Sequence, residues 1–146
     1  MPVAVQAVPY LIALALLAVV AGLSFGSWAA APALVAAAFV LFFFRDPERL
    51  SPQDEGLVVA PADGRVTQVE TTPDGTRVSI FLSLFNCHIN RAPVAGRVLS
   101  TLHTPGRFLP AFDADAGREN ERNHVVIRAS DGDYGVTQVA GLLARR

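Results

Sequence analysis

The chain has 146 residues, of which 51% are hydrophobic and 17% are charged, and its net charge is -1. This length fits one small domain, alone or with a membrane anchor. The apolar content excludes a disordered chain, and the near-neutral charge argues against a nucleic-acid-binding face. All 12 basic residues are arginine, so no lysine is present to hold pyridoxal phosphate, biotin or a lipoyl group, and the single cysteine, Cys87, excludes an internal disulfide.

The first 44 residues contain no charged side chain, and the first charge is that of Arg45. Two apolar runs, at residues 3–23 and 28–44, flank a Ser-Phe-Gly-Ser turn, and both lie at the low end of the roughly 17–25 residues that cross a bilayer. A secretory signal peptide would begin with basic residues, and none is present here. We therefore predict a membrane-anchoring helical hairpin over residues 1–44, with a pair of interfacial helices as the alternative.

The remaining residues, 45–146, are predicted to form one β-rich domain. Arg45 and Arg49 follow the second apolar run, and this position favours the cytoplasmic face of the cell membrane for that domain. Short runs rich in β-branched residues predict strands at 56–60, 64–70, 77–84, 96–102, 124–129 and 134–139, with turns at 71–76 and 131–133. Because no long helix interrupts these runs, we expect a mainly β barrel or sandwich after the hydrophobic hairpin.

An internal repeat refines this prediction. The pattern A-P-x-x-G-R-V occurs at residues 60–66 and again at 92–98. Proline restricts φ and glycine permits a positive φ, so each copy should form a tight turn that leads into a strand. Two copies predict a pseudo-duplicated barrel or sandwich with hammerhead-like halves.

Two positions in and near this repeat are candidates for catalysis. Asp63 lies in the first copy where the second has Ala95, as expected for a functional carboxylate on a duplicated scaffold; an Asp that caps a local turn is the alternative. His88 lies between Asn86 and Asn90, and strand geometry would place all three on one face. A histidine can transfer protons near neutral pH, or it can be a hydrogen-bonded structural residue.

Other polar residues have less specific interpretations. Asn120 and Arg122 belong to an amide- and arginine-rich stretch that can bind a phosphate or carboxylate, or can form a solvated loop with internal ion pairs. Cys87 is predicted to be a small buried residue. The three histidines are scattered, so we predict no metal site.

Five motifs in order resemble a known family, over the chain from about residue 40 to its last residue. They are F-F-R-D-P-E-R at 43–49, A-P-A-D-G-R-V at 60–66, F-N-C-H-I-N-R-A-P-V-A-G at 85–96, P-G-R-F-L-P-A-F at 105–112 and N-E-R-N at 120–123. Together with the two apolar runs, they closely resemble the short, membrane-anchored class of phosphatidylserine decarboxylase proenzymes.

This resemblance implies a carboxy-lyase that converts phosphatidylserine to phosphatidylethanolamine. It further implies a Schiff base between the serine amine of the lipid and a pyruvoyl group derived from the chain itself. Asp63 and His88 match the Asp and the first His of the family's self-cleavage machinery, whereas Arg91 replaces the second His of its H-x-x-H segment and leaves the division of roles open. The predicted substrate-binding residues are Asn90, Arg91, Asn120 and Arg122.

In the family the serine that becomes the pyruvoyl group lies some tens of residues beyond the position of Arg146. We therefore expect these residues to correspond to most of a β chain, without the pyruvoyl precursor and inactive alone. The expected partners are the phospholipid membrane, phosphatidylserine, a pyruvoyl-bearing α chain and a second copy in a homodimer, and no nucleic acid is expected. A non-catalytic, membrane-tethered carrier or adaptor barrel is the alternative function, although the absence of lysine removes the usual carrier role. A cell-wall metallopeptidase is disfavoured because the chain has no H-x-H pair.

Overall fold

A computed structural model of the chain describes residues 2–50, 52, 56–73, 75–113, 115–142 and 144. Two compact units make up the chain. The first comprises Met1–Leu50 and Ala62–Asn90, and the second comprises Ser51–Pro61 and Arg91–Arg146. This division differs from the predicted boundary between residues 44 and 45, which separates a membrane part from a soluble part and stays a prediction.

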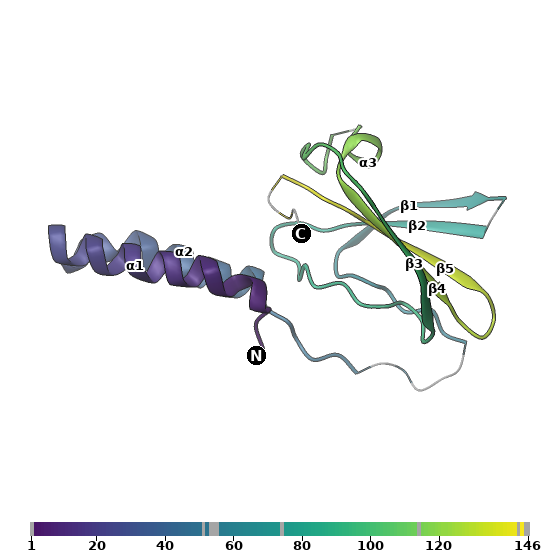
Figure 1. The fold of residues 1–146 in the computed structure, drawn as a ribbon, viewed down its shortest axis with the longest axis horizontal. Coiled ribbons are helices and arrows are strands. Elements are labelled where there is room, and N and C mark those ends of the chain that lie inside the picture. Colours follow the sequence, from purple (N-terminus) through teal and green to yellow (C-terminus); the bar gives the residue numbers. More distant parts are fainter. Residues whose placement is uncertain are drawn as a thin grey trace. The chain divides into compact units, whose positions relative to one another are not determined.

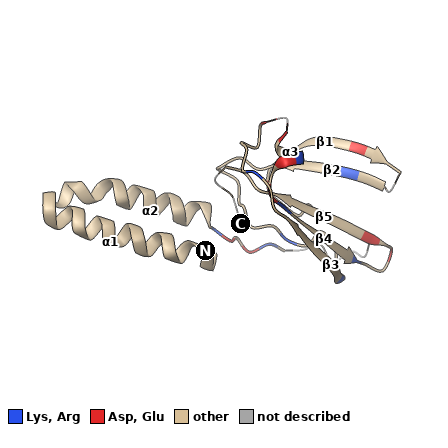
Figure 2. Ribbon diagram, turned by 45° about the horizontal axis from the view of Figure 1, so that its top comes forward, with Lys and Arg blue, Asp and Glu red and all other residues tan. Residues whose placement is uncertain are grey.

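The first unit begins with two antiparallel helices that lie side by side (Figures 1 and 2). Proline in the first turn suits each helix start, because the first N–H groups of a helix have no intrahelical partner. Gly26, with φ of 95°, ends the first helix in a conformation that favours glycine. The helical elements are η1 (Val5–Ala7), α1 (Val8–Phe25), η2 (Ser27–Ala30) and α2 (Ala31–Phe43). They confirm the predicted hairpin as a structural element.

The hairpin buries small side chains and exposes large ones. Its buried residues are Ala7, Ala18 and Ala33, whereas Leu16 and Leu23 are 63% and 84% exposed. Figure 2 shows α1 and α2 without a charged residue. The 21 residues of Val5–Phe25 are long and apolar enough to cross a membrane, and Ser27–Phe43 is a shorter apolar helix.

Backbone hydrogen bonds close the hairpin at the end opposite its turn. Residues 2–4 and 43–46, here called the hairpin end, are joined by an isolated bridge between Val3 and Arg45. The Ala4 N–H donates to the Phe44 carbonyl at 2.9 Å, and the Asp46 N–H donates to the Pro2 carbonyl at the same distance. These bonds hold the chain leaving α2 against the N-terminal residues.

Within the described residues the strands pair in antiparallel fashion. The fold is mainly β after a helical N-terminal part, as predicted. In the first unit β1 (Arg65–Thr72) pairs with β2 (Gly75–Phe81). The second unit has one sheet in the order β3-β4-β5, and a single helical turn lies between β3 and β4 in the chain. Its elements are β3 (Arg97–Thr104), α3 (Ala116–Glu119), β4 (Arg122–Arg128) and β5 (Asp133–Val139).

One predicted strand is wrong, and several predicted bounds move. Residues 56–60 form no strand, since proline at 61 offers no N–H and the Val59 N–H makes a single bond to the Pro93 carbonyl, at 2.9 Å. The strand predicted at 77–84 ends at Phe81, and the strand predicted at 96–102 continues to Thr104. The strand predicted at 124–129 already begins at Arg122.

The sequence repeat has matching geometry in its two copies. A Cβ atom on Gly64 would lie 2.3 Å from the Phe81 carbonyl oxygen, and one on Gly96 would lie 2.2 Å from the Arg128 carbonyl oxygen. The strand that follows each glycine shifts its register two residues further on, between Val66/Gln68 in one copy and Val98/Ser100 in the other. Each glycine therefore permits a close approach of backbone to backbone that leads into a bulged strand.

The Ala-Pro turns of the repeat also pair with each other. The Val59 N–H donates to the Pro93 carbonyl, and the Arg91 N–H donates to the Pro61 carbonyl at 2.8 Å. In both bonds the donor lies two residues before the proline of its own copy. This reciprocal pair is a local two-fold relation, as expected for a duplicated scaffold.

Candidate active site

The segment that contains His88 is a turn followed by irregular chain, not a strand. The Asn86 N–H donates to the Ser83 carbonyl at 3.0 Å, and the Asn86 Oδ1 accepts from the Ser83 N–H at 2.8 Å and from its hydroxyl at 2.7 Å. Asn86 therefore closes the turn. The predicted common face of Asn86, His88 and Asn90 is wrong, because the alternation of side chains holds only along an extended strand.

Asp63 forms an ion pair with Arg49. Its Oδ1 lies 2.6 Å from Nη2 of Arg49, and its side chain is 29% exposed. Hydrogen bonding to Arg49 lowers the pKa of the Asp63 carboxyl below its ordinary value, assisted by the charge of Arg49 and by a hydrogen bond with the backbone of Cys87. Asp63 is therefore ionised at neutral pH and cannot be the proton donor of the site.

His88 is oriented by two contacts. Its Nδ1 lies 3.1 Å from the Asn86 carbonyl oxygen, and its ring stacks on that of Phe43 with centroids 4.3 Å apart. A carbonyl oxygen only accepts hydrogen bonds, so the ring proton is assigned to Nδ1 and Nε2 has the free lone pair. Burial lowers the pKa of His88, and the charge of Arg45 lowers it further. The neutral imidazole is thus suited to accept a proton through Nε2.

Cys87 joins these two groups. It lies next to His88 in the chain, and its backbone hydrogen-bonds to Asp63. It is buried, with 1% of its surface exposed, which confirms its predicted status as a small buried residue. Its Sγ–H donates to the Arg45 carbonyl at 3.2 Å. The tertiary structure therefore brings Asp63 and the His88 segment together in the first unit.

Sequence reasoning missed two members of this cluster, Arg49 and Phe43. Both belong to the F-F-R-D-P-E-R motif, but Phe43 was assigned only to the second apolar run and Arg49 only to the membrane orientation. The signal that could have found them is the position of this motif as the first of the five family motifs. Nothing within residues 43–49 themselves indicates a partner near residue 63 or 88.

The neighbouring predicted residues differ in their surroundings. Asn90 Oδ1 is buried and has no hydrogen-bond partner within the described part of the chain. A buried amide oxygen of this kind suits a ligand N–H or O–H, since an unpaired buried acceptor costs free energy. The Arg91 backbone N–H donates a hydrogen bond to the Pro61 carbonyl, within the second unit. The roles of Asn90 and Arg91 as substrate ligands stay predictions.

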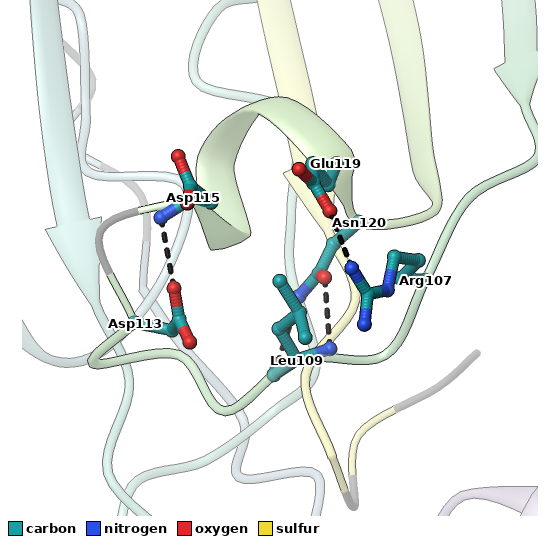
Figure 3. Close-up of polar contacts among 6 residues, drawn as sticks. All are labelled: Arg107, Leu109, Asp113, Asp115, Glu119 and Asn120. Carbon is teal, nitrogen blue, oxygen red and sulfur yellow. Dashed lines mark hydrogen bonds and ion pairs between the residues drawn. The ribbon is translucent and has the colours of Figure 1, made fainter.

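Asn120 has a structural setting in the second unit (Figure 3). It is 1% exposed, its Oδ1 accepts from the Leu109 N–H, and its Nδ2 donates to the carbonyls of Leu109 and Ala140, all at 2.8 Å. Arg122 donates to the carbonyls of Gly117 and Arg118, at 3.2 and 2.6 Å, at the end of α3. These bonds satisfy carbonyls that a short helix leaves unpaired. The substrate-binding roles of Asn120 and Arg122 stay predictions.

The fold and the site define a class of protein: an apolar helical hairpin followed by a duplicated β scaffold, with a histidine stacked on the hairpin end and a carboxylate paired with Arg49. Within the described residues no group of three or more His, Cys, Asp or Glu side chains is arranged to bind a metal ion.

Comparison with known proteins identifies the family within this class. The chain belongs to the phosphatidylserine decarboxylase family, whose model matches residues 36–146. It is similar to the phosphatidylserine decarboxylase proenzyme of Ruegeria pomeroyi, with 48% identity over 116 aligned residues that cover 72% of this chain and 53% of the relative. The chain spans about half the length of the relative it matches.

Proposed function

We propose that this chain provides the acid–base machinery of a phosphatidylserine decarboxylase proenzyme, a carboxy-lyase that produces phosphatidylethanolamine. The observation that carries the proposal is that residues 43–49 contact both candidates, since Arg49 pairs with Asp63 at 2.6 Å and the Phe43 ring stacks on His88, within a chain of this family. It links the two residues that match the self-cleavage motif, although 24 other residues separate them in sequence.

The chemistry of these residues fits a site built around a carbonyl group. A pyruvoyl group, derived from a serine of the proenzyme, supplies an electron sink for decarboxylation when it is present. His88 offers a neutral imidazole whose Nε2 is assigned no proton, and Asn90 offers a buried acceptor for an amine or hydroxyl. The absence of lysine is compatible with a sink derived from the chain itself.

The residues of this chain have distinct proposed roles. His88 accepts the hydroxyl proton of the cleavage serine through Nε2 and later holds a proton close to the reacting lipid. Asp63, fixed by Arg49, orients the segment before His88 and maintains a negative charge beside it. Asn90, Arg91, Asn120 and Arg122 are proposed to bind the phosphatidylserine headgroup, with the phosphate assigned to the arginines.

The hairpin is proposed to anchor the chain to the membrane. Its buried side chains are alanines, and many of its large apolar side chains are exposed, as in helices whose surroundings are lipid. Arg45 and Arg49 support a cytoplasmic position for the rest of the chain. A pyruvoyl-bearing α chain is the proposed partner, and a homodimer is proposed for the assembled protein.

The catalytic proposal is tested in a polypeptide that contains these residues together with the family's Gly-Ser cleavage step. We expect His88→Gln and Asp63→Asn to abolish separation into two chains on a denaturing gel. The matched controls are His124→Gln, whose Nδ1 contacts Thr137, and Asp133→Asn, which pairs with an arginine as Asp63 does. Normal cleavage in both site variants would disprove the assignment.

The membrane proposal is tested by flotation of the 146-residue chain with vesicles of anionic phospholipid. We expect it to float with the lipid, and a version that begins at residue 45 to stay at the bottom of the gradient. Resistance of bound residues 8–43 to added protease would show insertion. Flotation of both versions would assign membrane binding to the β part instead.

A further inference from the structure

The hairpin end contacts the His88 segment at three points, all within the first unit. The Phe43 ring stacks on the imidazole of His88, with 25° between the ring planes. Arg45 Nη2 donates to the Phe85 carbonyl at 2.7 Å, and the Arg45 carbonyl accepts from Cys87. The residues before and at His88 are therefore held from the side of the hairpin.

Arg45 is itself fixed to the hairpin. Its Nη1 donates to the Phe42 carbonyl at 2.8 Å, and its guanidinium lies 4.0 Å from the centre of the Phe42 ring. A cation over an aromatic face is held in a defined position. The Arg45 side chain that joins the end of α2 to the turn at residues 83–86 is therefore held at both ends.

We propose that Phe43 is a positioning residue for His88, so that the end of the hairpin forms one wall of the proposed active site. The proposal rests on the proposed function of His88 and adds the residue that orients it. Two contacts define the imidazole plane: the Asn86 carbonyl at its edge and Phe43 across its face. Without the aromatic ring, the hydrogen bond to Asn86 does not fix the plane of the imidazole by itself, because the ring can rotate about that bond.

A second consequence concerns solvent. Burial is the main cause of the lowered pKa of His88, and the Phe43 ring covers one face of the imidazole. The charged groups around this site are Arg45, Arg49 and Asp63, and none of them changes when Phe43 is replaced. Loss of the aromatic ring should therefore raise the pKa of His88 toward that of an exposed histidine, because water then solvates the imidazolium.

The test uses the 146-residue chain in lipid nanodiscs, with histidine rings labelled for NMR. We expect Phe43→Leu to move the His88 ring signals downfield, since the stacked ring no longer shields them, and to raise the pKa of His88. Phe43→Tyr restores the aromatic ring and should return both values to those of the wild type. Leu41→Ala, on the same helix, and the signals of His103 and His124 are controls that should not move.

A fold check accompanies these variants. Loss of the amide signals of β1 and β2 in Phe43→Leu would mean that this variant does not fold. Phe43→Met then provides the same test, because the flexible methionine side chain can pack in the space that the aromatic ring leaves. Unchanged His88 shifts and an unchanged pKa in the folded variant would overturn the proposal.

Activity of the proenzyme separates this proposal from the proposed function. We expect Phe43→Leu to slow cleavage, and to lower kcat for decarboxylation by up to about 100-fold with little change in KM, since small displacements of a proton-transfer group have effects of that order. If His88→Gln is fully active while Phe43→Leu moves the NMR signals, Phe43 positions His88 but the proposed function fails. If His88 is essential and Phe43→Leu has wild-type rates and signals, the positioning role fails.

Discussion

The close backbone approach at Gly64 allows a quantitative prediction, because Gly64 combines two features that other glycines have separately. Its φ is +134°, and an added Cβ would lie 2.3 Å from the Phe81 carbonyl oxygen. Ordinary Cβ contacts begin near 3.4 Å, so β1 and β2 would have to separate by about 1 Å at this end of their pairing. Gly64→Ala should therefore destabilise the β1–β2 hairpin strongly.

The expected magnitude has two parts. A non-glycine residue in a sparsely populated backbone region costs about 1–3 kcal/mol. Forcing an extra carbon into a packed position costs about 1–3 kcal/mol more. The sum, about 2–6 kcal/mol, corresponds to a loss of roughly 30-fold or more in protection of the hairpin amides, because each 1.4 kcal/mol is about tenfold.

Three other glycines separate these parts. Gly96 has the close approach, at 2.2 Å, without a positive φ; Gly75 has φ of +131° with nothing within 4 Å; Gly117 has neither. We expect alanine to cost about 1–3 kcal/mol at Gly96 and at Gly75. At Gly117, in α3, it should be neutral or stabilising by up to about 1 kcal/mol.

Amide hydrogen exchange is the appropriate assay. Protection is measured at the amides of β1 and β2 for the Gly64 and Gly75 variants, and at those of β3 and β4 for the Gly96 and Gly117 variants. Fluorescence of the single tryptophan, Trp28, would report on the helical hairpin instead. Equal losses for Gly64→Ala and Gly75→Ala would refute the reasoning, because the carbonyl of Phe81 would then contribute nothing.

Three further predictions concern side chains with defined partners. Arg49→Gln should raise the pKa of Asp63. In the wild type the pKa of Asp63 is lower in the folded than in the unfolded chain, so its contribution to stability is complete above the unfolded pKa and is lost as pH falls through the folded pKa. NMR titration should show the raised pKa, and acid unfolding should show a weaker dependence of stability on pH in the variant. Asn120→Ala should destabilise the second unit by about 3 kcal/mol or more, because three buried hydrogen bonds are lost, and an equally stable variant by exchange at β4 would contradict the buried network. Asn86→Ala should cost about 1 kcal/mol and broaden the His88 ring signals, since the turn at residues 83–86 loses its closing oxygen; sharp, unshifted signals would exclude that role.

Much of the fold could be predicted from the sequence because it depends on local patterns. Uncharged apolar runs flanking a glycine turn form α1 and α2, and runs rich in β-branched residues form five of the six predicted strands within a few residues of their bounds. The repeated A-P-x-x-G-R-V pattern also predicted a duplicated scaffold, since proline and glycine act on the backbone at their own positions. Residues 56–60 have the composition of a strand but form none, because β-propensity depends on a partner.

The site was only partly predictable. Asp63 and His88 could be selected as candidates from their positions within motifs, and Cys87 as a buried residue. Which groups surround them was decided by the tertiary structure: Arg49 pairs with Asp63, Phe43 covers His88, and Asn120 is bonded inside the second unit instead of facing solvent. The physical reason is that backbone patterns act over a few residues, whereas ion pairs, ring stacking and burial join side chains that only folding brings within contact distance.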